Sequence, residues 1–124
     1  MFALSSQHRF LLYSQATDMR KSFDGLSGLI KNKLSTNPQN GDVFIFINKD
    51  RDKIKLLHWA GSGYTLYYKR LESGTFELST YDTKAGGIKL DYARMVMIID
   101  GLSIKNVNTR KRYSEPQKAT KSMV

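Results

Sequence analysis

The spacing of apolar residues along the chain predicts a strand followed by a helix in its first third. Four consecutive apolar or aromatic residues occupy positions 10–13, within a predicted strand at 8–14. Further apolar residues then recur at intervals of four, three, four and four positions, which is the repeat of one helical face. This face consists of Met19, Phe23, Leu26, Ile30 and Leu34. The pattern therefore predicts a helix that begins at Met19 and ends before the loop at Pro38–Gly41.

Two features bear on the start and the interior of this predicted helix. Thr17 or Asp18 is suited to cap its N-terminus, because a short side-chain oxygen accepts a hydrogen bond from an unpaired backbone amide. Gly25 and Gly28 lie in its interior, where each glycine costs about 1 kcal/mol relative to alanine. The two glycines therefore indicate either close packing of another backbone or a helix that breaks early.

Apolar runs between residues 42 and 90 predict a series of strands. The run at 42–49 is continuous in Val, Ile and Phe, which is typical of a strand buried on both faces. Runs at 53–60, 64–71 and 75–81 are separated by short polar or glycine turns, which predict an antiparallel meander. Ile88 and Leu90 predict a last short strand. Asp91 is suited to cap a second helix that runs to about Asp100 and stops at Gly101.

This order of elements indicates an α+β fold, with a curled antiparallel sheet of about five strands and both helices against one face. The length of 124 residues suits one domain. Large apolar side chains become scarce after Leu102. We therefore predict a domain at residues 1–102 and a flexible basic tail at residues 103–124.

The chain is basic, with a formal net charge of +9. Residues 103–124 carry six cations and one anion, so more than half of the excess charge lies in the predicted tail. A protein with this charge attracts polyanions such as nucleic acid. No run approaches the roughly 18 apolar residues of a membrane span. The N-terminus also lacks the pattern of a signal peptide, so we expect a cytoplasmic protein, with association with the nucleoid an open alternative.

The residues that carry catalytic chemistry are sparse. Cysteine is absent, and only His8 and His58 could supply imidazole ligands to a metal. Asp50 and Asp52 lie in a turn between cations, which is typical of a solvated turn rather than a two-metal nuclease site. No phosphate-binding loop or nucleophile motif occurs. We therefore expect a protein that is not an enzyme, with no cofactor, metal or small-molecule substrate.

Three regions are candidates for binding DNA or a protein partner. The first is the pair of strands at 53–71, where aromatic residues alternate with cations in a pattern that suits base stacking and phosphate binding. The second is a polar stripe of the first helix, in which Arg20 and Asp24 are spaced to pair. The third is the tail. The candidate binding residues are Arg20, Lys21, Lys31, Lys55, Trp59, Lys69, Arg70, Arg110, Lys111 and Arg112. Packing of the sheet, a solvated helix face and a solubilising tail are the corresponding structural alternatives.

Several blocks of sequence resemble one family of bacterial proteins. They are TDMRKSFDGL at 17–26, GDVFIFIN at 41–48, DKIKLLHW at 52–59, and GYTLYYKRLE at 63–72 followed by GTF at 74–76. Together they are similar to the Orf2-like accessory proteins of the insertion sequence sixty-six family. The likeness covers about residues 2–78, with a weaker echo at 98–102. The chain departs from the family pattern at Leu78-Ser79, where Trp-Pro is common, and at 48–53, where the family turn is richer in arginine.

The resemblance implies an accessory protein for transposition, encoded beside a larger transposase that holds the catalytic acids. Its expected partners are that transposase and double-stranded DNA, with no membrane involved. A protein-interaction adaptor that makes no contact with DNA is the main alternative. An enzyme acting on DNA is a third hypothesis, which the lack of an assembled acidic site disfavours.

Overall fold

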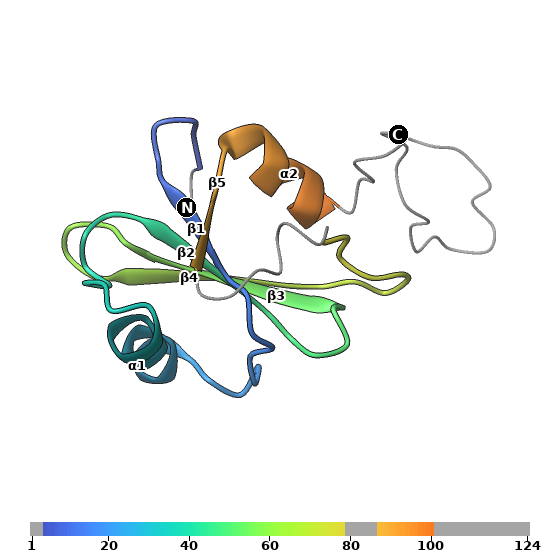
Figure 1. Ribbon diagram of the computed structural model, residues 1–124, viewed down its shortest axis with the longest axis horizontal. Helices are drawn as coiled ribbons and strands as arrows, with labels where there is room; N and C mark the ends of the chain where they lie inside the picture. Colours follow the sequence, from blue (N-terminus) through green and yellow to red (C-terminus); the bar gives the residue numbers. More distant parts are fainter. Residues whose placement is uncertain (1–3, 79–86, 101–124) are drawn as a thin grey trace.

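A five-stranded sheet forms the centre of the protein in a computed structural model that describes residues 4–78 and 87–100 (Figure 1). The elements are β1 (Phe10–Tyr13), α1 (Phe23–Lys33), β2 (Val43–Ile47), β3 (Lys53–Trp59), β4 (Tyr64–Arg70), β5 (Gly87–Leu90) and α2 (Tyr92–Asp100). The strand order is β4-β3-β2-β1-β5. The α+β class is therefore confirmed. Neither helix of the described residues has the length and apolar composition that a membrane span requires.

The sheet is mixed, so the prediction of a purely antiparallel sheet was wrong at one pair of strands. β1 runs parallel to β2, with Phe10 opposite Val43, whereas the pairs β2–β3, β3–β4 and β1–β5 are antiparallel. The reason is the connection, because α1 lies between β1 and β2 and returns the chain to the same end of the sheet. Alternation of apolar residues predicts strands but not their direction.

The two helices cover opposite faces of the sheet, which corrects the expectation that both lie on one face (Figure 1). Leu26 and Ile30 of α1 pack with Phe44, Phe46 and Leu57. Residues of α2 pack on the other side with a second cluster of strand residues. That cluster includes Leu12, Val43, Ile45, Ile54, Leu56, Met95 and Ile98. Below, the two sides are called the α1 face and the α2 face. β2 contributes to both clusters, so both of its faces are buried. This explains why its apolar run is continuous.

The predicted strand at 75–81 is not a strand in its described part, residues 75–78, and residues 79–81 lie outside the described residues. Phe76 is nevertheless 1% exposed and belongs to the core of the α2 face. Its backbone amide donates to the carbonyl of Arg51 at 2.6 Å, and the amide of Leu71 donates to the carbonyl of Asp52 at 2.7 Å. This segment therefore anchors an apolar side chain through turn contacts and adds no strand to the sheet.

α1 begins at Phe23, four residues later than predicted, and Ser22 occupies its N-cap position without a side-chain capping bond. Asp18 does not cap the helix, because its carboxylate accepts hydrogen bonds from the backbone and side chain of Arg20. The predicted pairing of Arg20 with Asp24 was therefore wrong. Phe23 is 43% exposed, so the buried face of α1 is narrower than the periodicity indicated. The helix also continues through both of its glycines.

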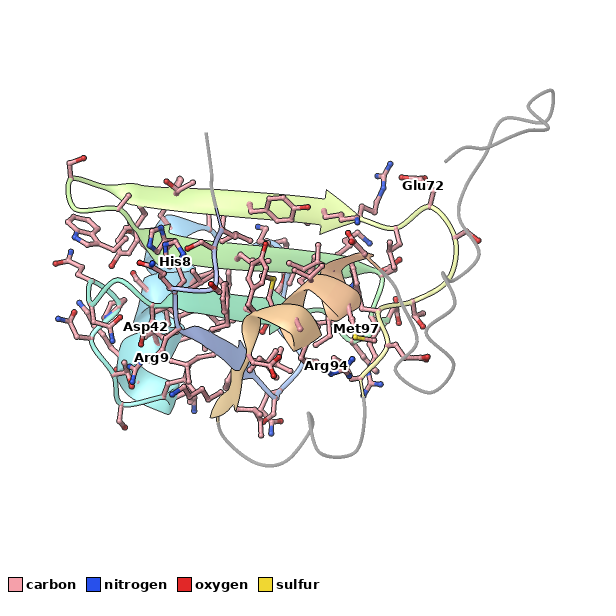
Figure 2. All side chains as sticks on the ribbon, turned by 90° about the horizontal axis from the view of Figure 1, so that it is seen from above. His8, Arg9, Asp42, Glu72, Arg94 and Met97 are labelled. Carbon is pink, nitrogen blue, oxygen red and sulfur yellow. The ribbon has the colours of Figure 1, made fainter. Side chains whose placement is uncertain are left out.

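A buried carboxylate joins the starts of the two parallel strands (Figure 2). Asp42 is 6% exposed and accepts hydrogen bonds from Arg9 Nε at 3.0 Å and from Arg9 Nη2 at 2.6 Å. The Asn40 amide donates to the same carboxylate at 3.0 Å. The amide of Val43 also donates to the carbonyl of Arg9 at 2.8 Å. These contacts fix the register of β1 against β2 at the end of the sheet that is remote from Asn48.

Candidate nucleic-acid interface

A groove on the α1 face brings together three segments that are separate in the sequence. Its volume is about 400 Å³, within the roughly 300–1,000 Å³ that is typical of small-molecule sites. The segments are the loop before α1, the turn between β2 and β3, and the hairpin β3–β4. The lining residues are Thr17, Asp18, Met19, Arg20, Asn48, Lys49, Asp50, Lys53 and Tyr68. We call this feature the groove.

Lys55 holds the loop side of the groove in place. It is 5% exposed, and its ammonium donates hydrogen bonds of 2.7 Å to the carbonyls of both Met19 and Lys21. Burial lowers the pKa of Lys55, and the negative charge of Asp18 partly opposes that shift. Because the ammonium is enclosed and bonded, Lys55 cannot reach a duplex in this structure. We therefore reassign Lys55 from a candidate DNA contact to a residue that positions the loop.

The loop itself carries a charged pair at its tip. Arg20 donates to both oxygens of Asp18, with the shortest contact at 2.7 Å, and hydrogen bonding to Arg20 lowers the pKa of Asp18 to about 2. The Arg20 side chain is 91% exposed, so it remains accessible to a ligand. The amide of Thr17 donates to the carbonyl of Ile47 at 2.9 Å and ties the start of the loop to the end of β2.

The opposite wall of the groove is a turn organised by Asn48. The Asn48 side-chain oxygen accepts from the amides of Asp52 and Lys53, both at 3.0 Å, and its amide donates to Asp52 at 2.7 Å. This last bond is the main cause of the lowered pKa of Asp52. Arg51 takes a φ of 58°, as a tight turn requires. The turn therefore holds Lys49, Asp50 and Lys53 on a rigid frame.

Tyr68 presents an aromatic ring to the groove and is 51% exposed. The ammonium of Lys55 lies 4.6 Å from the centroid of this ring, on the neighbouring strand. A cation at that distance is attracted by the face of the ring. The Lys55 ammonium therefore covers one face of the Tyr68 ring, and the exposed area of Tyr68 lies on the rest of its side chain.

The structure divides the other predicted residues among several locations. Lys21 and Lys31 are exposed, at the loop and in the last turn of α1. Trp59 is half-buried against Tyr64, with ring centroids 5.0 Å apart, at the end of β3 opposite to the groove. Trp59 is six positions along the strand from Lys53, which corresponds to roughly 20 Å. The predicted aromatic and basic cluster is therefore not one continuous surface.

Lys69 and Arg70 point to opposite faces, as strand alternation predicts. The ammonium of Lys69 donates to the carbonyl of Ile99 at 2.8 Å, near the end of α2, where a cation is favourable. Arg70 pairs with Glu72 at 2.9 Å and lies opposite Lys53 in the hairpin. Arg70 thus adds a cation near the groove, whereas Lys69 contacts a helix end. Arg110, Lys111 and Arg112 lie outside the described residues.

Sequence reasoning missed two cations of the groove, Lys49 and Lys53, because their turn was interpreted as merely solvated. Tyr68 was recognised as part of an aromatic strand, but its position beside the loop at 17–20 depends on tertiary contacts. No group of three or more His, Cys, Asp or Glu side chains within residues 4–78 and 87–100 is placed to hold a metal ion.

His8, which precedes β1, lies against His58 of β3, with ring centroids 4.9 Å apart in an edge-to-face arrangement. Burial lowers the pKa of His58, proximity to His8 lowers it further, and a hydrogen bond with the backbone of Gly41 opposes the shift. In the unfolded chain His58 titrates near its ordinary pKa of about 6.5. The unfolded state therefore binds more protons in mildly acidic solution, and acid favours unfolding.

We expect the free energy of unfolding to fall as the pH is lowered from about 7 to about 5, and to fall less in His58→Gln. Asp18 and Asp52, whose pKa values are lowered, do not contribute in this window because they lose stabilising charge only below about pH 4. Urea unfolding of both proteins across the window measures the slope. Identical slopes would show that His58 does not carry the pH dependence.

Comparison with known proteins identifies the family. The family described as IS66 Orf2 like protein matches residues 8–109 of this chain. The uncharacterized protein y4jC of Sinorhizobium fredii is 32% identical over 110 residues, which covers 89% of this chain and 92% of that protein. The uncharacterized protein y4hO of the same organism is 29% identical over 86 residues, which covers 69% and 73% of the two chains. No solved structure matches this chain.

The chain therefore belongs to the IS66 Orf2-like family, which confirms the resemblance seen in its sequence. Membership implies an accessory role in the transposition of an insertion sequence. The family match continues to residue 109, seven residues beyond the predicted end of the domain at Leu102. The division between domain and tail stays a prediction.

Proposed function

We propose that this protein assists transposition by contacting the DNA of its insertion sequence through the groove and the cations around it. It acts beside a separate transposase that performs the chemistry. The observation that carries the proposal is the convergence of Arg20, Lys49 and Lys53 from three segments around an exposed Tyr68. Cations that flank an aromatic ring are a recurrent means of binding nucleic acid.

Three further observations support contact with DNA. The whole chain carries a net charge of +9, which favours association with a polyanion at long range. The loop that forms one wall of the groove, residues 17–22, also lies within the sequence block that resembles the family most clearly. Lys55 and Asn48 hold the two walls in fixed positions, so the surface is formed before a ligand arrives.

The purified full-length protein should bind a labelled DNA duplex with little sequence preference, and its affinity should fall steeply as salt increases. The reason is that each neutralised phosphate releases condensed counterions, so log K falls with a slope of about −0.9 per contact. Fluorescence anisotropy at several salt concentrations measures this slope. Lack of binding even at low salt would favour the adaptor hypothesis, in which the transposase is the direct partner.

A further inference from the structure

One aromatic ring in the groove is both fixed and accessible. Tyr68 is 51% exposed, while the Lys55 ammonium lies 4.6 Å from its centroid. Lys55 is itself held by two backbone carbonyls at 2.7 Å, so the cation behind the ring cannot move freely. The result is a pre-positioned aromatic surface that lines the groove. Such a surface suits a planar ligand that stacks on it.

We propose that the groove receives an unpaired nucleotide of DNA, whose base stacks on Tyr68 while Lys49 and Lys53 hold its phosphate. This inference rests on the proposed function, because it takes DNA to be the partner and names the part of DNA that enters. Paired bases in a duplex present only their edges in the grooves. The face of a base becomes available for stacking on a side chain when the base is unpaired.

The positions of the cations fit a phosphate attached to a base that stacks on Tyr68. Lys53 and Arg70 form the strand pair next to Lys55 and Tyr68 on the same face of the hairpin. Two residues of strand place these cations about 7 Å from the ring along the sheet. Lys49 reaches the groove from the turn and Arg20 from the loop, so cations lie on more than one side.

The acids of the groove do not cancel this preference. Three cations line it against two acids, Asp18 and Asp50. Asp18 and Arg20 balance one another as an ion pair, at distances down to 2.7 Å, so Lys49 and Lys53 remain against Asp50. Asp50 is exposed on the turn. The groove, with a volume of about 400 Å³, is large enough for a ligand of small-molecule size.

The test compares three DNA probes with the full-length protein: a blunt duplex, the same duplex with a short single-stranded overhang of thymidines, and an oligothymidine strand. Affinities are measured for the wild type, Tyr68→Ala, Tyr68→Leu and Tyr68→Phe. Tyr92→Ala serves as the matched control, because Tyr92 is also exposed, at 37%, but lies on α2. Thermal unfolding of each variant establishes that it is folded. Tyr68→Leu keeps apolar bulk if the alanine variant fails to fold.

We expect the wild type to prefer the overhang and the single strand over the blunt duplex. Tyr68→Ala and Tyr68→Leu should lose about tenfold in affinity for these two probes, since a stacked base contributes on that scale, and should lose less affinity for the blunt duplex. Tyr68→Phe and Tyr92→Ala should resemble the wild type.

Equal binding of all probes by wild type and variants would overturn the inference while leaving duplex binding, and hence the proposed function, intact. Loss of binding to every probe by the wild type would remove the proposed function itself. A transposition defect in Tyr68→Ala without any change in DNA binding would assign the groove to a protein partner and overturn the inference.

Discussion

Replacing Lys55 with methionine is expected to lower the free energy of unfolding by about 2 kcal/mol. The substitution removes two ammonium hydrogen bonds to the carbonyls of Met19 and Lys21, and bonds to a charged group contribute about 1.5–3 kcal/mol each. Methionine recovers part of this loss because an apolar side chain in the same site avoids the desolvation of an ammonium. Urea unfolding of the two proteins measures the difference.

Lys53→Met is the matched control for this prediction. Lys53 lies on the same strand and face as Lys55, but about a third of its side chain is exposed and its contact with Asp52 is long, at 3.5 Å. We expect this control to change stability by less than about 0.5 kcal/mol. Hydrogen exchange at the Thr17 amide, which bonds to Ile47, should accelerate in Lys55→Met alone. If both variants lose equal stability, the ammonium does not anchor the loop.

The second large effect is expected in transposition. Changing Lys21, Lys49 and Lys53 together to glutamine should reduce transposition of a marked element in cells by at least about tenfold. All three lie in or beside the groove, and if each contacts a phosphate, the salt slope of duplex binding becomes shallower by about 2.7. Because these side chains are at least partly exposed, the variant should fold with nearly unchanged stability.

The control for this experiment removes the same charge elsewhere. Lys31 and Lys33 lie in the last turn of α1 and Lys89 lies on β5, and all three are exposed. The last turn of an eleven-residue helix is about 15 Å from its start, so Lys31 and Lys33 are remote from the loop at 17–20. Lys89 lies on the edge strand β5, which β1 and β2 separate from β3. We expect the control to transpose at close to the wild-type rate. Equal defects in both variants would show that the total charge, and not its position in the groove, governs transposition.

The sequence determined most of the elements and the faces of the hairpin. Five continuous apolar residues in β2 required burial on both sides, and both faces are buried. Alternation in β3 and β4 placed Leu57 and Leu66 on one face and Ile54 and Tyr67 on the other, as the two core clusters show. These properties are local, because the pleat of a strand fixes where successive side chains point. The residues at 17–26 and 41–76 were also sufficient by themselves to indicate the family.

Only the tertiary structure decided which lysine is accessible and where the groove lies. Lys53 and Lys55 look equivalent in the sequence, two positions apart on one face of one strand. The loop before α1 crosses over Lys55 and encloses it, while Lys53 stays at the rim with Lys49 and Tyr68. Tertiary contacts also decided two other properties: the parallel pairing of β1 with β2 and the placement of α1 and α2 on opposite faces. They depend on contacts between residues about thirty or more positions apart, such as Lys55 with Met19 and Arg9 with Asp42, and the spacing of apolar residues carries no record of those contacts.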